Sequence, residues 1–180
     1  QEIKLGGIVG INNKSSSVSE ITNVINYGKI SGSTDDEINI GGIAGENEEG
    51  IPKIQNAYNK GVIEGTSNID DGLKIGGIVG NAESTINRVY NTGNIISNSI
   101  THYIGGIIGD LHSSVVISKS KYLSTTATGA AQEEELEGVE RVDSLTNEEI
   151  KELLNQGVKE LNETTNELIE WQNIEKIKTI

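Results

Sequence analysis

The sequence predicts an all-β protein: a right-handed parallel β-helix (β-solenoid) of about four coils, followed by a C-terminal helical cap. Two observations support this fold class. A glycine-rich pentapeptide and a second element ending in Asn-x-Gly alternate along the first two thirds of the chain. The apolar residues are mostly Ile, Val and Leu, with no Phe or Met and one Trp, which favours strands with stacked aliphatic interiors. A different repeat-built architecture, with antiparallel strands, is the alternative.

The first recurring element is Gly-Gly-aliphatic-aliphatic-Gly, and we expect a short strand at each copy. Its four copies begin at Gly6, Gly41, Gly76 and Gly105, with two equal intervals and then a shorter one. The pattern is not G-x-G-x-x-G, and no predicted helix follows it, so a phosphate-binding loop is disfavoured. The glycines instead indicate close approach of the backbone to a neighbouring segment.

The second element is an Ile-x-x-x-(Ile/Tyr)-Asn-x-Gly segment after each pentapeptide, with a degenerate fourth copy at residues 117–123. The Asn-x-Gly part of this element occurs three times, as the pairs Asn26 and Gly28, Asn59 and Gly61, and Asn91 and Gly93. Asn and Gly both tolerate positive φ, so we expect a tight corner there. Each unit would then contain three short strands: the pentapeptide, the Ile-x-x-x-Tyr segment, and the stretch after Asn-x-Gly.

Stacked coils would place equivalent side chains above one another, about 4.8 Å apart. One expected aliphatic ladder comprises Ile8, Ile43, Ile78 and Ile107. A second expected ladder comprises Ile21, Ile54, Ile86 and Ile117. Tyr58 and Tyr90 occupy equivalent positions next to Ile25, and we interpret them as a structural stack rather than as a platform for a sugar.

Two acidic corners follow the Asn-x-Gly elements of the first two units. Asp35 and Asp36 lie in one corner, and Asp70 and Asp71 lie in the other. Carboxylates brought close together repel one another unless they are solvated, protonated or bridged by a cation, and calcium prefers oxygen ligands. No EF-hand spacing is present. A solvated acidic face is therefore the first interpretation, and a calcium site is the alternative; no other cofactor is expected.

The chain divides into a repeat region, residues 1–129, and an acidic linker with a helical cap, residues 130–180. Thr146 and Glu149 form a capping-box pattern. An apolar stripe at helical spacing follows it.

This stripe allows one helix to about Gln172, or two helices divided at Gly157, since glycine weakens a helix interior. We expect the helix to cover the open end of the solenoid or to pack along its side. A docking face for a neighbouring domain is the alternative.

No pattern of catalytic residues is found, so we expect a protein that is not an enzyme. The net charge of −13 argues against nucleic-acid partners, and no apolar run is long enough for membrane insertion. The absence of Cys removes thiol chemistry. His102 and His112, even with Asp110 nearby, lack the spacing of a zinc site. A solenoid enzyme acting on carbohydrate is the weakest alternative.

The two repeated elements together resemble the GLUG motif over roughly residues 3–125. The segment Tyr122-Leu123-Ser-Thr-Thr-Ala-Thr-Gly129 also looks like the end of such an array. The resemblance implies a scaffold without catalytic residues. Such repeats occur in large bacterial surface or secreted proteins, including adhesins, and in the non-catalytic region of immunoglobulin A proteases.

We therefore expect a non-catalytic, adhesin-like interaction module of a larger protein that is extracellular, either secreted or associated with the cell wall. Its partner would be a host protein, a glycan, or a neighbouring domain of the same chain. The expected binding loops are residues 11–18, 33–39, 46–52 and 66–73. The alternative is a substrate-positioning region of a secreted zinc metallopeptidase of the immunoglobulin A protease type.

Overall fold

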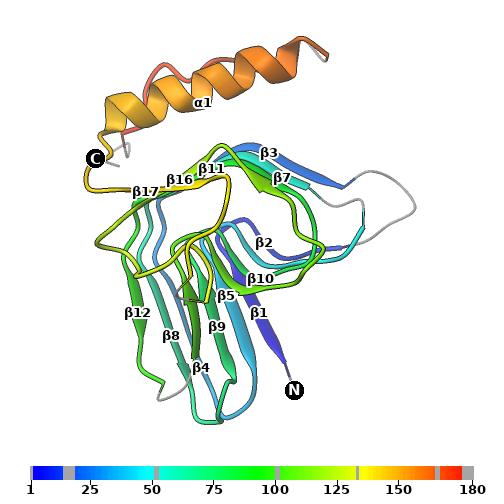
Figure 1. The fold of residues 1–180 in the computed structure, drawn as a ribbon, viewed down its shortest axis with the longest axis vertical. Coiled ribbons are helices and arrows are strands. Elements are labelled where there is room, and N and C mark those ends of the chain that lie inside the picture. The colour runs from blue at the N-terminus through cyan, green and yellow to red at the C-terminus, as the bar shows by residue number, and fades with distance from the viewer. Residues whose placement is uncertain are drawn as a thin grey trace, which may run out of the picture.

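Parallel strands form a β-solenoid, as predicted (Figure 1). The computed structural model describes residues 2–13, 19–50, 53–99, 102–132, 134–164 and 167–175. The described residues contain three complete coils and a partial fourth, slightly fewer than predicted. All the strand pairings between coils are parallel, so the antiparallel alternative is wrong.

Each complete coil contains four strands. The first coil comprises β1 (Ile3–Gly6), β2 (Val9–Asn12), β3 (Glu20–Asn26) and β4 (Ile30–Thr34). The second comprises β5 (Ile38–Gly41), β6 (Ala44–Asn47), β7 (Lys53–Asn59) and β8 (Ile63–Ser67). The third comprises β9 (Leu73–Gly76), β10 (Val79–Ala82), β11 (Ile86–Asn91) and β12 (Ile95–Ser97). The partial fourth comprises β13 (His102–Gly105), β14 (Ile108–Leu111), β15 (Ile117–Ser118) and β16 (Ser120–Leu123).

Equivalent strands of successive coils form four sheets. Sheet 1 has the order β1-β5-β9-β13, and sheet 2 has the order β14-β10-β6-β2. Sheet 3 has the order β17-β16-β11-β7-β3, with β15 also paired to β11, and sheet 4 has the order β12-β8-β4. Strand β17 (Val139–Val142) pairs in parallel with β16, and the pairing begins with Ser120 opposite Val139. The stacking therefore extends beyond residue 129, where the sequence predicted an acidic linker.

The prediction of a strand at each glycine pentapeptide is wrong, because the pentapeptide is a corner. In the second coil, β5 ends at Gly41 and β6 begins at Ala44. A Cβ atom on Gly41 would overlap the carbonyl oxygen of Ala44, and one on Gly42 would overlap that of Gly77. Only glycine lets the backbone turn so close to itself and to the next coil. The corner joins sheet 1 to sheet 2, which gives each coil one more strand than predicted.

Both predicted isoleucine ladders are present. In the second ladder, Ile54 pairs with Ile21 on one side and with Ile86 on the other, and Ile86 pairs with Ile117. In the first ladder, backbone amides bind the equivalent carbonyl of the next coil at 2.9–3.0 Å, from Ile8 through Ile43 and Ile78 to Ile107. Ile43, Ile78 and Ile107 have no exposed surface, whereas Ile8 at the end of the stack is 43% exposed.

The C-terminal helix lies along the outer face of sheet 3 and does not cover an end of the solenoid (Figure 1). Helix α1 (Asn147–Asn162) begins with the predicted capping box of Thr146 and Glu149. It ends ten residues before the predicted limit, and Gly157 does not interrupt it. An apolar cluster seats it on the sheet, and this cluster comprises Tyr58, Tyr90, Ile150, Leu154 and Ile174. Among the described residues, no helix has the length and apolarity to cross a membrane.

Candidate functional site

The repeated Asn residues form a buried ladder that joins the coils. Asn26 Nδ2 donates to Asn59 Oδ1 at 2.9 Å, and Asn59 Nδ2 donates to Asn91 Oδ1 at 2.9 Å. Each Asn also binds both the backbone amide and the carbonyl of the glycine two residues later. These glycines are Gly28, Gly61 and Gly93. The polar residues of the repeat are therefore held in structural hydrogen bonds, because a buried amide must be satisfied within the protein.

The two predicted acidic loops lie side by side, because Thr34 of β4 pairs with Ser67 of β8. Asn68 Nδ2 donates to Asp35 Oδ1 at 2.6 Å, and the Ser67 hydroxyl donates to the Asp36 carbonyl at 2.8 Å. Asp70 and Asp71 follow in the second loop, with Asp71 at a φ of 56°. Within the described ranges, no group of three or more His, Asp or Glu residues could hold a metal ion. The calcium site stays a prediction.

The described parts of the other two predicted loops, residues 11–13 and 46–50, also lie next to each other. Asn13 Nδ2 donates to Glu48 Oε1 at 3.3 Å. Residues 14–18 and 51–52 lie outside the described residues. The described parts of the predicted binding loops thus form two pairs, each between neighbouring coils.

The two histidines lie apart in different interactions. His102 Nδ1 is 3.1 Å from the Ser99 carbonyl, and His112 Nε2 is 3.5 Å from Glu83 Oε1. Asp110 instead pairs with Lys74 at 2.9 Å.

A column of positive-φ residues crosses sheet 3, and the sequence reading missed it. Its members are Asn23, Asn56, Arg88 and Lys119, with φ values of 56°, 51°, 53° and 52°. They occupy equivalent positions, two residues after each isoleucine of the second ladder. Asn tolerates this conformation, but it is uncommon for Arg and Lys. The sequence did contain a signal for this column: at the equivalent position, the first two repeats have Asn, whereas the third and fourth have a cationic residue.

Every member of this positive-φ column contacts the C-terminal segment. Asn23 Oδ1 accepts hydrogen bonds from Trp171 Nε1 at 2.6 Å and from Asn56 Nδ2 at 2.9 Å. Asn56 Nδ2 also donates to the Leu154 carbonyl at 3.0 Å. Arg88 and Lys119 both pair with Glu160 of α1. The column is therefore the polar seat of the helix on the solenoid.

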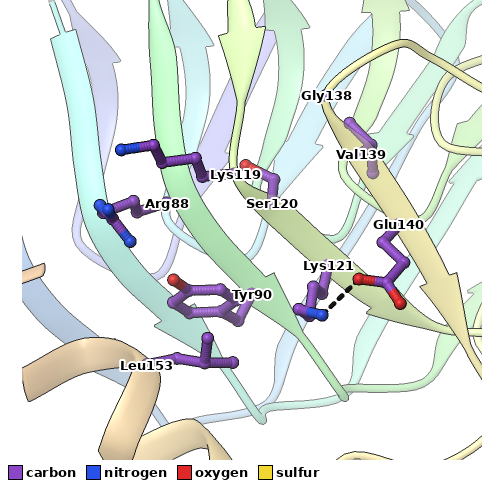
Figure 2. A pocket seen from close by; sticks show the side chains of 9 residues that line it. All are labelled: Arg88, Tyr90, Lys119, Ser120, Lys121, Gly138, Val139, Glu140 and Leu153. Carbon is purple, nitrogen blue, oxygen red and sulfur yellow. Dashed lines mark hydrogen bonds and ion pairs between the residues drawn. The ribbon is translucent and has the colours of Figure 1, made fainter. Parts of the chain in front are cut away.

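A pocket opens where the cationic end of this column meets α1, β16 and β17 (Figure 2). Its volume is about 380 Å³. The lining residues are Arg88, Tyr90, Lys119, Ser120, Lys121, Gly138, Val139, Glu140 and Leu153. Three cations thus surround one pocket in a chain whose net charge is −13.

The charges around this pocket are partly compensated. Lys121 pairs with Glu140, as the dashed line in Figure 2 shows. The hydrogen bond from Arg88 lowers the pKa of Glu160 below its usual value. Burial raises the pKa of Tyr90. The Tyr90 hydroxyl is buried and donates to no acceptor among the described residues.

A solved structure shares this fold. The crystal structure of a candidate immunoglobulin A1 protease from Bacteroides ovatus matches with a TM-score of 0.63 at 17% identity, covering 84% of this chain and 47% of that one. This chain therefore spans about half the length of the protein it matches. At this identity the similarity shows the fold alone. No protein-family model and no curated protein matches the sequence, so the resemblance to GLUG repeats stays a prediction.

Proposed function

We propose that this chain is a non-catalytic, adhesin-like interaction module of a larger bacterial protein that is secreted or carried on the cell surface. The observation that supports the proposal is that the polar residues of the repeat are taken up by hydrogen bonds within the solenoid. Asn26, Asn59 and Asn91 are bound within the ladder and to the following glycines. The repeat therefore builds a rigid support, and sequence variation is left to the corner loops, where binding residues are commonly found.

The paired acidic loops are the part of the surface best suited to meet a partner. Backbone pairing of β4 with β8 fixes loops 33–39 and 66–73 at the spacing of adjacent coils. A rigid support lowers the entropic cost of binding, because few loop residues must be ordered on contact. A host protein, a glycan or a neighbouring domain of the parent chain would bind across both loops.

The experiment is a binding screen of the purified chain against a glycan array and host extracellular proteins. The matched variant changes Asp35, Asp36, Asp70 and Asp71 to Asn, which removes charge while preserving size and, at Asp71, tolerance of positive φ. A ligand bound by the wild-type chain and lost in this variant supports the proposal. A ligand bound equally by both proteins contradicts the assignment of the loops. Running the screen with calcium and with a chelator tests the calcium prediction.

The similarity to a candidate immunoglobulin A1 protease favours a second function. In this alternative, the chain is a non-catalytic region of a secreted zinc metallopeptidase and positions the substrate for a catalytic domain elsewhere. Surface plasmon resonance with immunoglobulin A1, and with immunoglobulin G as the control, tests it. Selective binding of immunoglobulin A1 supports substrate positioning. Equal or absent binding of the two immunoglobulins contradicts it.

A further inference from the structure

Two of the cations that line the pocket between sheet 3 and α1 already pair with one carboxylate. Glu160, from the last turn of α1, lies between the Arg88 guanidinium and the Lys119 ammonium, the latter at 3.2 Å. The Arg88 side chain is only 7% exposed, so its charge acts in a partly desolvated setting. Hydrogen bonds between ionised groups, such as those from Arg88 and Lys119 to Glu160, are stronger than hydrogen bonds between neutral groups. The geometry of the cation pair therefore suits a carboxylate.

A free donor adjoins this cation pair. The Tyr90 hydroxyl is buried, donates to no acceptor among the described residues, and points toward the side of the pocket where Arg88 lies (Figure 2). The Arg88 guanidinium beside it can only donate a hydrogen bond. A buried hydroxyl whose proton has no acceptor destabilises the folded protein. An acceptor atom supplied by a ligand would remove that destabilisation. A carboxylate bound at Arg88 would bring such an acceptor.

The remainder of the pocket is apolar enough for a carbon skeleton. The Tyr90 ring, Val139 and Leu153 line it (Figure 2). Its volume of about 380 Å³ lies at the lower end of the range for small-molecule sites. The volume is sufficient for a small organic molecule, such as an acid with a single ring.

The backbone at the site is also unusual. Arg88 and Lys119 hold φ values of 53° and 52°, a conformation that strains such residues and is often found at binding sites. The first two coils place Asn at the equivalent positions. A cation there brings strain that Asn would avoid, and an anion bound to the two cations, such as the carboxylate of Glu160, offsets that strain.

We propose that this pocket binds a small organic carboxylate, whose carboxylate group is held by Arg88, Lys119 and the Tyr90 hydroxyl and whose carbon skeleton lies against Val139 and Leu153. Glu160 occupies the cation pair when the ligand is absent and competes with it. This site is separate from the corner loops, so it stands whether or not the loops bind a partner.

Isothermal titration of the full chain with benzoate, glucuronate and inorganic phosphate tests the proposal. Benzoate represents an aromatic acid and glucuronate an acidic sugar, so the two arms distinguish the possible sources of the carboxylate. The variants are Arg88→Asn, which copies the residue of the first two coils, Tyr90→Phe and Glu160→Gln. Lys29→Asn, at an exposed ion pair in the first coil, is the control for loss of one positive charge.

We expect one carboxylate to bind with one-to-one stoichiometry. Arg88→Asn should weaken binding about tenfold or more, and Tyr90→Phe about three- to tenfold. Glu160→Gln should strengthen binding, since it removes the competing carboxylate, and Lys29→Asn should leave it unchanged. Circular dichroism establishes that each variant is folded.

Three results would overturn the proposal. The first is the absence of binding by both the wild-type chain and Glu160→Gln. The second is equal affinity in the wild-type, Tyr90→Phe and Arg88→Asn proteins. The third is tighter binding of inorganic phosphate than of either carboxylate, which would assign the cations to a different anion.

Discussion

Asn56 of the solenoid lies directly against Gly157 of α1, in the space that any larger residue at position 157 would fill. A Cβ atom on Gly157 would overlap Asn56 Oδ1. Asn56 cannot easily move, because its Nδ2 donates to Asn23 Oδ1 and to the Leu154 carbonyl. The glycine is thus required by the contact between helix and sheet, and it costs the helix some of its own stability.

Gly157→Ala should therefore destabilise the protein, although alanine is the better helix former by about 1 kcal/mol. Overpacking at a tight contact costs about 1–3 kcal/mol, so we expect a lower melting temperature and weaker protection of α1 amides from hydrogen exchange. Glu152→Ala, at an exposed position of the same helix, is the control. A higher melting temperature for Gly157→Ala would show that α1 can shift without cost.

The Asn ladder should be most sensitive at its middle member. Asn59 bonds to Asn26, Asn91 and both backbone groups of Gly61, so Asn59→Ala leaves several buried groups unsatisfied. We expect a loss of about 3 kcal/mol or more in the free energy of unfolding. Asn26→Ala is the matched control at the end of the ladder and should cost about half as much. Urea denaturation measures both, and equal losses would contradict the ladder.

The first isoleucine ladder can be tested in the same way, by comparing a substitution in the middle of the ladder with one at its end. Ile78 is fully buried, whereas Ile8 is 43% exposed. Ile78→Asp buries an unpaired charge, and we expect a loss of about 4 kcal/mol or more. Ile8→Asp should cost roughly 1 kcal/mol, since its carboxylate can reach water. Thermal unfolding followed by circular dichroism compares the two variants. An unchanged melting temperature for Ile78→Asp would refute its place in the ladder.

Alkaline pH should destabilise the fold through its buried tyrosines. Burial raises the pKa of Tyr58, Tyr90 and Tyr122 above the ordinary value of 10.0, and for Tyr122 the hydrogen bond to Glu135 raises it further. The folded chain therefore keeps protons that the unfolded chain releases near pH 10. This contribution to stability is complete below about pH 10 and is lost as the pH rises through the folded-state pKa values.

Melting temperatures measured from about pH 8 to pH 11.5 test this expectation. They should be steady at first and then fall above about pH 10, with tyrosinate absorbance appearing together with unfolding. Tyr90→Phe removes one of the three groups and should make the fall less steep. A melting temperature that does not change across this range would contradict the burial of these hydroxyls.

The repeat made the solenoid predictable from the sequence. Because equivalent residues recur along the chain, parallel stacking in register is the arrangement that buries Ile54 against Ile21 and Ile86. The local pattern misplaced the pentapeptide, however. Its aliphatic residues suggested a strand, but the space around Gly41 and Gly42 is too small for a Cβ atom, and so the chain turns there. That constraint comes from the neighbouring coil.

The sequence by itself determined the stacked coils, their register and the capping box of Thr146 and Glu149 at the start of α1, because each depends on a local or repeated pattern. Only the tertiary structure decided where α1 lies and which residues form the pocket beneath it. Arg88 and Glu160, or Asn23 and Trp171, meet across long stretches of chain. Such contacts leave no periodic signal, and they depend on how the helix seats on the finished sheet.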